Sequence, residues 1–145
     1  IEIGAPIERV WLRLAEVERQ PEWMVDLKWV RIETPGPIRV GSRASALVRI
    51  MGIGVADPVE VIEFVPPHAY AVRHEGHFQG SGVFHLEALE GNGGRTRVTW
   101  DETLIPPILP NLLGLILAPI LGRVFRADLE RLRDQLEIEM VTVGR

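Results

Sequence analysis

One uncharged stretch, from Leu104 to Gly122, limits the folds open to this chain more than any other feature of its sequence. The stretch is too apolar for an ordinary surface helix. It also contains prolines at too many positions for the continuous run of about 20 apolar residues that crosses a membrane as a helix. The prolines are Pro106, Pro107, Pro110 and Pro119. We therefore expect a buried lid or the start of a helix, and the alternative is an exposed patch that touches a membrane.

The residues after this stretch have the spacing of an amphipathic helix. Apolar side chains recur every three or four positions from Leu121 to Met140, and charged side chains occupy the other faces. This spacing predicts a long C-terminal helix with one buried face.

The rest of the chain alternates between short strands, helices and turns. Residues 1–3 alternate like a strand, residues 7–17 have helical spacing after a proline, and a second short helix or tight turn follows Pro21. Within the longest strand pattern, Asp57-Pro58 indicates an edge strand or a bulge. The expected strands cover 29–34, 43–51, 55–65, 69–75, 78–89 and 95–105. No linker or repeat divides the chain, so we expect one domain, residues 1–145.

Charge and cysteine content exclude several classes of function. The net charge of −4 and the scattered arginines argue against nucleic-acid binding, which needs a basic surface. The absence of cysteine excludes disulfides, thiolate catalysis and cysteine-based metal sites. No signal peptide is visible, although the chain begins at Ile1 and we expect a few residues to precede it. We expect a cytoplasmic protein.

Several segments resemble the polyketide cyclase/dehydrase and lipid-transport proteins of the START-like (SRPBCC) superfamily. They are Ile3–Trp11, Pro21–Trp23, Gly36-Pro37 with Val40–Arg43, Val61–Glu63 before Pro66-Pro67, and Gly94–Trp100. The resemblance implies an α+β helix-grip fold, in which a curved antiparallel sheet of about six or seven strands wraps around a long C-terminal helix. Two short helices are expected after the first strand. The resemblance also implies a large apolar cavity between sheet and helix, and it supplies no family-wide catalytic motif.

Strand alternation indicates which polar side chains face such a cavity. Glu102 shares a face with Trp100, and His74 shares a face with Tyr70. An inward carboxylate needs a partner or takes up a proton. Tyr70, His74 and Glu102 are therefore our candidates for orienting a ligand and for catalytic proton transfer. The alternative is that these side chains lie at a hydrated rim.

The apolar wall is expected from the short second helix, the strands and the uncharged stretch. Among the tryptophans Trp23 is favoured for ligand contact, because the resemblance places the cavity entrance near the second helix. The complete set of expected ligand-binding residues is Trp23, Met24, Tyr70, His74, Phe78, Phe84, Trp100, Glu102, Leu113, Ile116, Leu117 and Ile120.

Metal and nucleophilic chemistry have little support in the sequence. His74 and His77 lie three positions apart across a glycine, without the helical spacing or third ligand that a zinc site needs. No Gly-x-Ser-x-Gly motif is present. We expect no metal and no cofactor.

These patterns predict a protein that binds or transports an apolar or amphipathic small molecule, such as a lipid, an isoprenoid or a polyketide-like compound. One alternative is a cyclase or dehydratase that uses the same cavity. Another is a membrane- or protein-partner module that uses residues 104–122. We expect no nucleic-acid partner, no transmembrane span, and a monomer or homodimer.

Overall fold

The computed structural model describes residues 1–50, 52–89, 91, 94–107 and 110–143. The elements are β1 (Glu2–Ile3), α1 (Ile7–Ala15), the 3-10 helix η1 (Val17–Glu22), β2 (Leu27–Ile32), β3 (Arg43–Ile50), β4 (Ile53–Val65), β5 (Ala69–Glu75), β6 (Gln79–Leu89), β7 (Arg95–Ile105) and α2 (Pro110–Val143). This order confirms the predicted sequence of a short strand, two short helices, a run of strands and a long helix.

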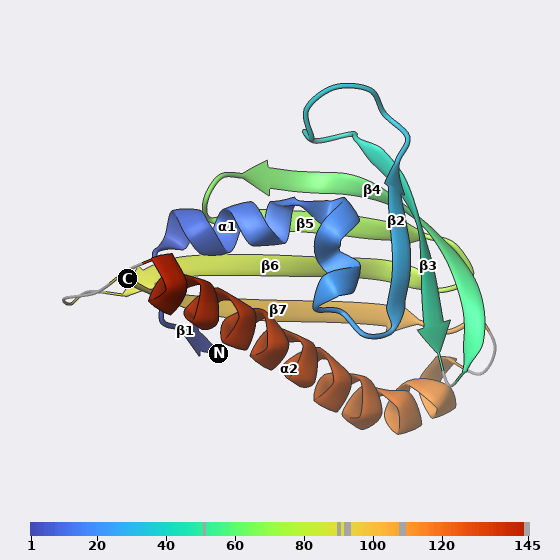
Figure 1. The fold of residues 1–145 in the computed structure, drawn as a ribbon. Coiled ribbons are helices and arrows are strands. Elements are labelled where there is room, and N and C mark those ends of the chain that lie inside the picture. The colour runs from blue at the N-terminus through green and yellow to red at the C-terminus, as the bar shows by residue number, and fades with distance from the viewer. Residues whose placement is uncertain (51, 90, 92–93, 108–109, 144–145) are drawn as a thin grey trace.

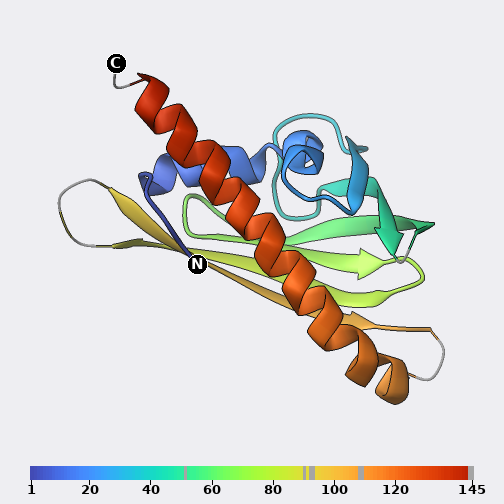
Figure 2. The same ribbon diagram turned by 60° about the horizontal axis from the view of Figure 1, so that its bottom comes forward.

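The strands form one seven-stranded antiparallel sheet in the order β1-β7-β6-β5-β4-β3-β2. Strands from β2 to β7 pair with their neighbours in the chain, and β1 pairs with β7 through Glu2 opposite Arg97. Figures 1 and 2 show that the sheet curves, that α1, η1 and α2 lie on the same side of it, and that α2 crosses the strands obliquely. The predicted helix-grip fold is confirmed.

The Asp57-Pro58 dipeptide does not mark an edge strand. β4 continues through Pro58, which lies opposite Ser45 of β3, and β5 flanks β4 on its other side. The pairing of β4 with β5 begins at Val59, so the missing N–H of Pro58 lies just beyond that ladder. The edge prediction was therefore wrong. The only register shift between these two strands falls at Val61 and Glu63.

The α2 helix begins at Pro110, well before the amphipathic spacing that starts at Leu121. Proline suits a first helical turn, because its missing N–H would have no helical partner there. Pro119 lies inside the helix and offers no N–H to the carbonyl of Leu115. Leu115 is 77% exposed, so water can reach that carbonyl. Among the described residues, no helix is both long and apolar enough to cross a membrane.

The packed core lies between α1, the second half of α2 and the end of the sheet that holds β1. The buried face of α2 consists of Leu129, Leu132 and Leu136, spaced by three or four residues as in an amphipathic helix. Ile3 of β1 and Leu14 of α1 are fully buried in the same cluster. The first half of α2 takes no part in this core.

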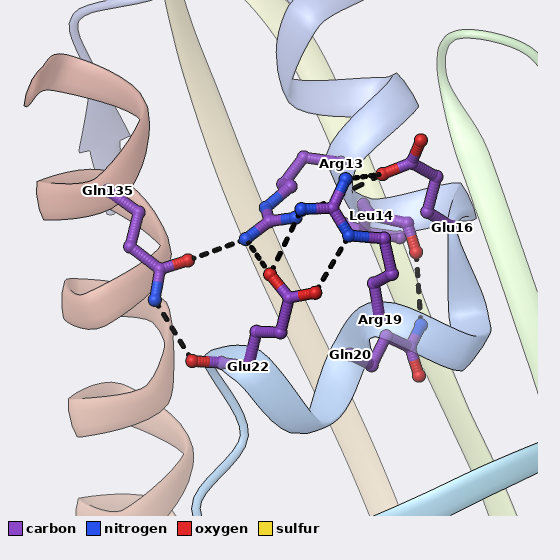
Figure 3. A network of polar contacts seen from close by, with 7 residues as sticks. All are labelled: Arg13, Leu14, Glu16, Arg19, Gln20, Glu22 and Gln135. Carbon is purple, nitrogen blue, oxygen red and sulfur yellow. Dashed lines mark hydrogen bonds and ion pairs between the residues drawn. The ribbon is translucent and has the colours of Figure 1, made fainter. Parts of the chain in front are cut away.

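A polar network centred on Arg13 fastens α2 to the two short helices (Figure 3). Arg13 Nη2 donates to Glu22 Oε2 at 2.6 Å and to Gln135 Oε1 at 3.0 Å. Gln135 Nε2 in turn donates to the backbone carbonyl of Glu22 at 2.9 Å. Hydrogen bonds from Arg19 and Arg13 lower the pKa of Glu22 to about 2. The network therefore fixes the position of α2 relative to η1.

Candidate functional site

A cavity of about 360 Å³ lies between the sheet and the first half of α2. Alternate residues of the strands form one wall, as in Val55, Asp57 and Val59 of β4, and α2 contributes Leu117 and Leu121 to the other wall. The volume falls in the range of about 300–1,000 Å³ that is typical of small-molecule sites.

Short side chains on β3 help to keep this space open. Ala44 and Ala46 both line the cavity, and they project much less far toward α2 than a leucine or phenylalanine would. The buried leucines of α2 lie in its second half, away from the cavity. The sequence therefore fills one end of the space between the two layers and leaves the other end hollow.

Three polar side chains form a hydrogen-bonded triad on the cavity wall. His74 Nδ1 lies 2.7 Å from Asp57 Oδ2, and His74 Nε2 lies 2.8 Å from Glu102 Oε1. Trp100 Nε1 donates to Glu102 Oε2 at 2.8 Å. The side chains of Asp57, His74 and Glu102 are 16%, 13% and 9% exposed. The triad is thus nearly enclosed.

The carboxylates determine the charge of His74. Burial lowers the pKa of His74, but hydrogen bonds to Asp57 and Glu102, together with their negative charges, outweigh burial and raise the pKa to about 9. At neutral pH the ring is therefore an imidazolium, and each of its nitrogens donates to a carboxylate.

A glycine on β6 allows this triad to form across the sheet. His74 on β5 lies opposite Gly80, and Glu102 on β7 lies opposite Gly82, so β6 separates the two partners. A Cβ atom at Gly82 would overlap Glu102 Oε2 and lie 3.0 Å from Glu102 Cδ. Glycine at position 82 therefore leaves the space through which the Glu102 carboxylate reaches His74.

Aromatic rings form the wall next to the triad. The ring of Trp100 lies 4.7 Å from Phe84 and 4.4 Å from Phe125, measured between centroids. Tyr70 stacks on Phe84 at 6.5 Å. Burial raises the pKa of the Tyr70 hydroxyl, so this group is neutral. All four rings line the cavity.

Most of the predicted ligand-binding residues lie on the cavity wall, namely Met24, Tyr70, His74, Phe78, Phe84, Trp100, Glu102, Leu117 and Ile120. Trp23 does not: it is fully buried in the core, with its ring 6.3 Å from Phe84. Ile116 is 54% exposed and is not among the lining residues. The side chain of Leu113 lies outside the described part of the structure. That any of these residues contacts a ligand remains a prediction.

Three residues of the site were not predicted from the sequence: Asp57, Gly82 and Phe125. Asp57 lies two positions before Val59 and four before Val61, so strand alternation alone would have placed it on the inner face. The following proline led us to interpret it as an interruption. A glycine inside a strand pattern often marks a close approach of another group, and Gly82 is such a case.

The uncharged first turns of α2 have one face toward the cavity and another face toward solvent. Leu117 and Ile120 line the cavity, while Leu115 and Ile116 face outward and are 77% and 54% exposed. Ile120 lines the cavity and is itself 42% exposed. Cavity-lining and exposed apolar side chains thus occupy different faces of one helix.

No metal centre is evident in the part of the chain that the structure describes. No three His, Asp or Glu side chains there are arranged to hold an ion. His77 is exposed in the turn between β5 and β6.

The fold and the cavity define a helix-grip protein, and a comparison with protein families agrees. The sequence model of the family "Polyketide cyclase / dehydrase and lipid transport" matches residues 1–137. The chain belongs to this family. No curated protein sequence matches it.

Several solved structures share this fold. TTHA0849 from Thermus thermophilus is 21% identical over 96% of this chain and 94% of its own, with a TM-score of 0.75. The Zhui aromatase/cyclase from Streptomyces sp. R1128 is 19% identical over 94% and 90%, with a TM-score of 0.76. A START superfamily protein from Mycobacterium smegmatis is 19% identical over 94% of both chains, with a TM-score of 0.72. At these identities the likeness concerns the fold.

Proposed function

We propose that this protein binds and carries an apolar or amphipathic small molecule in the cavity between the sheet and α2. The expected ligands are lipids, isoprenoids and polyketide-like ring compounds. The observation that carries the proposal is the cavity of about 360 Å³, with mostly apolar walls contributed by both layers. Burial of apolar ligand surface would drive binding, at about 25 cal/mol per Å² before the costs of association.

The polar groups of the cavity have a role in this proposal. A mostly apolar site fixes the orientation of its ligand through a few polar contacts. Tyr70 and the triad of Asp57, His74 and Glu102 are such contacts, since all of them line the cavity. A ligand would enter beside Ile120, which both lines the cavity and is 42% exposed.

A second candidate is a cyclase or dehydratase, favoured by the hydrogen bonds that join His74 to two carboxylates inside the cavity. The fold of the Zhui aromatase/cyclase agrees with this candidate. We rank it second because both nitrogens of His74 already donate to carboxylates, so the ring has no lone pair with which to accept a proton from a substrate.

Binding of the neutral fluorescent probe N-phenyl-1-naphthylamine tests the proposal. The wild-type protein should bind the probe saturably. Ala46→Trp places an indole in the cavity and should weaken binding at least about tenfold, because the probe and the indole compete for the same volume. Thr103→Trp is the matched control, since Thr103 is exposed on the outer face of β7. Circular dichroism verifies that both variants fold.

Equal probe binding by Ala46→Trp and wild type would place the probe elsewhere and refute the proposal. The enzyme candidate has its own assay, in which a linear poly-β-ketone thioester is incubated with the protein. A cyclase would accelerate ring closure with loss of water, measured by liquid chromatography and mass spectrometry. A rate equal to the spontaneous reaction would count against it.

A further inference from the structure

The triad carries an unbalanced negative charge inside the cavity. A neutral imidazole has one N–H, whereas the two nitrogens of His74 each lie within 2.8 Å of a carboxylate oxygen. With both carboxyl groups ionised, the ring is an imidazolium, with one positive charge between Asp57 and Glu102. Two carboxylates and one imidazolium leave a net charge of −1 in surroundings that are mostly apolar.

Other charged groups near the cavity do not offset this charge. Arg43 contributes lining atoms, but its guanidinium pairs with Glu75 at 2.6 Å and with Glu60 at 3.5 Å. Arg49 also contributes lining atoms, and it is exposed on the far end of β3. Within the described ranges, no Lys or Arg forms an ion pair with Asp57 or Glu102. Two further carboxylates line the cavity: Asp128 pairs with Arg131 at 3.2 Å, and Asp26 adds negative charge rather than removing it.

One carboxylate oxygen of the triad is available to a guest. Glu102 Oε1 accepts from His74 and Glu102 Oε2 accepts from Trp100. Asp57 Oδ2 accepts from His74, and across the described chain no donor reaches Asp57 Oδ1. A carboxylate oxygen accepts strong hydrogen bonds, above all from cationic donors.

A second polar group lies unused in the same cavity. Tyr70 is only 6% exposed and lines the cavity, and no described residue forms a hydrogen bond with its hydroxyl. This hydroxyl is not among the fully buried polar atoms that lack a partner, so it is accessible and can form a hydrogen bond with a polar atom of a guest. The ring of Phe84 stacks with Tyr70, and the ring of Trp100 lies on Phe84 in turn. The faces of such rings attract cations.

We infer that the guest of this cavity is a cationic amphiphile, whose ring-bearing body packs against the aromatic wall and whose protonated amine donates to Asp57 Oδ1. This inference rests on the proposed binding function and names the chemical class of the ligand. An anionic guest of the same shape would be repelled by the net negative charge of the triad.

Three naphthalene compounds of similar shape and different charge test this inference. They are 2-(1-naphthyl)ethylamine, 2-(1-naphthyl)ethanol and 1-naphthylacetic acid, each used to displace N-phenyl-1-naphthylamine at neutral pH. We expect the cationic amine to displace the probe at a concentration at least about tenfold lower than the anionic acid, with the alcohol between them.

Asp57→Asn removes one negative charge and should reduce the preference for the amine over the acid at least about fivefold. Asp101→Asn is the matched control, because Asp101 is exposed on the outer face of β7 and its loss changes the net charge equally. It should keep the wild-type preference. If Asp57→Asn does not fold, the same measurement is made with Glu102→Gln.

The outcomes separate the two proposals. If Ala46→Trp abolishes probe binding but the wild type shows no preference for the amine, the inference of a cationic ligand is refuted and the binding function stands. A preference of the wild type for the acid would also refute the cationic ligand. The same holds if the wild type prefers the amine but neither Asp57→Asn nor Asp101→Asn changes that preference. Failure of the probe and of all three compounds to bind would refute the binding function itself.

Discussion

Raising the pH from about 6 to about 10 should destabilise this protein by about 3 kcal/mol through His74 alone. Burial opposes the charge of this ring, but the hydrogen bonds and charges of Asp57 and Glu102 raise its pKa from 6.5 to about 9. A tenfold change in proton affinity is worth about 1.4 kcal/mol, so this rise corresponds to about 3 kcal/mol. Little of this energy is lost to solvent screening, because the side chain is only 13% exposed.

The sign follows from the direction of the change. The folded protein holds the proton on His74 more tightly than the unfolded chain does, because the folded pKa is the higher of the two. The protonated His74 therefore makes its full stabilising contribution to the free energy of unfolding below about pH 6.5. It decreases as the pH rises toward about 9 and is absent above that value.

Urea unfolding followed by tryptophan fluorescence at closely spaced pH values measures this contribution. We compare the wild type with His74→Gln, and the difference between their curves isolates His74 from the other titrating groups. His85→Gln is the control, because His85 is exposed on the outer face of β6. The free energy of unfolding of the wild type and of His85→Gln should fall between about pH 6.5 and about pH 9, whereas that of His74→Gln should change much less.

Parallel curves for the wild type and His74→Gln across this pH interval would contradict the reasoning. An NMR titration gives a direct check on the same group. A pKa of His74 at or below 6.5 would mean that the two carboxylates do not hold an imidazolium between them.

Three further predictions concern the triad, the polar network and the core. Gly82→Ala should displace the Glu102 carboxylate and lower the pKa of His74, as measured by NMR; an unchanged pKa would show that the close approach is unimportant. Arg13→Ala should lower the free energy of unfolding by about 1–3 kcal/mol in urea, because it releases α2 from η1, and a loss near zero would contradict this. Leu132→Ala, at a fully buried position, should cost about 2–5 kcal/mol, and a smaller cost would mean that the core collapses around it.

The sequence predicted most of the fold, because the fold depends on local patterns. Alternation in the strands placed Tyr70, His74 and Glu102 on inner faces, and the structure has all three on the cavity wall. These features need only the period of a strand and the chemistry of turns.

The triad itself was not predictable from these patterns. His74 and Glu102 are on strands separated by β6, so their contact depends on the register of two ladders and on the glycine at position 82. Alternation gives the face of each residue but not its partner on another strand. Asp57 was not predicted because Pro58 follows it, and a proline in a strand pattern usually indicates an edge strand or a bulge. Here Pro58 lies just beyond the end of the β4–β5 ladder, so the strand continues through it.

Trp23 was misplaced for a different reason. Its short helix was expected at a cavity entrance, but the η1 turn directs the ring into the core beside Phe84. The direction of a side chain after a 3-10 turn depends on tertiary packing rather than on a repeating spacing.

Intermolecular NOEs from bound N-phenyl-1-naphthylamine test the internal cavity most directly. Val72 on β5 and Leu117 on α2 contribute methyl groups to opposite walls. A guest held between the sheet and the helix should give NOEs to both of these residues at once. NOEs confined to the exposed side chains of Leu115 and Ile116 would place the probe on the outer surface of α2, and the central claim would be wrong.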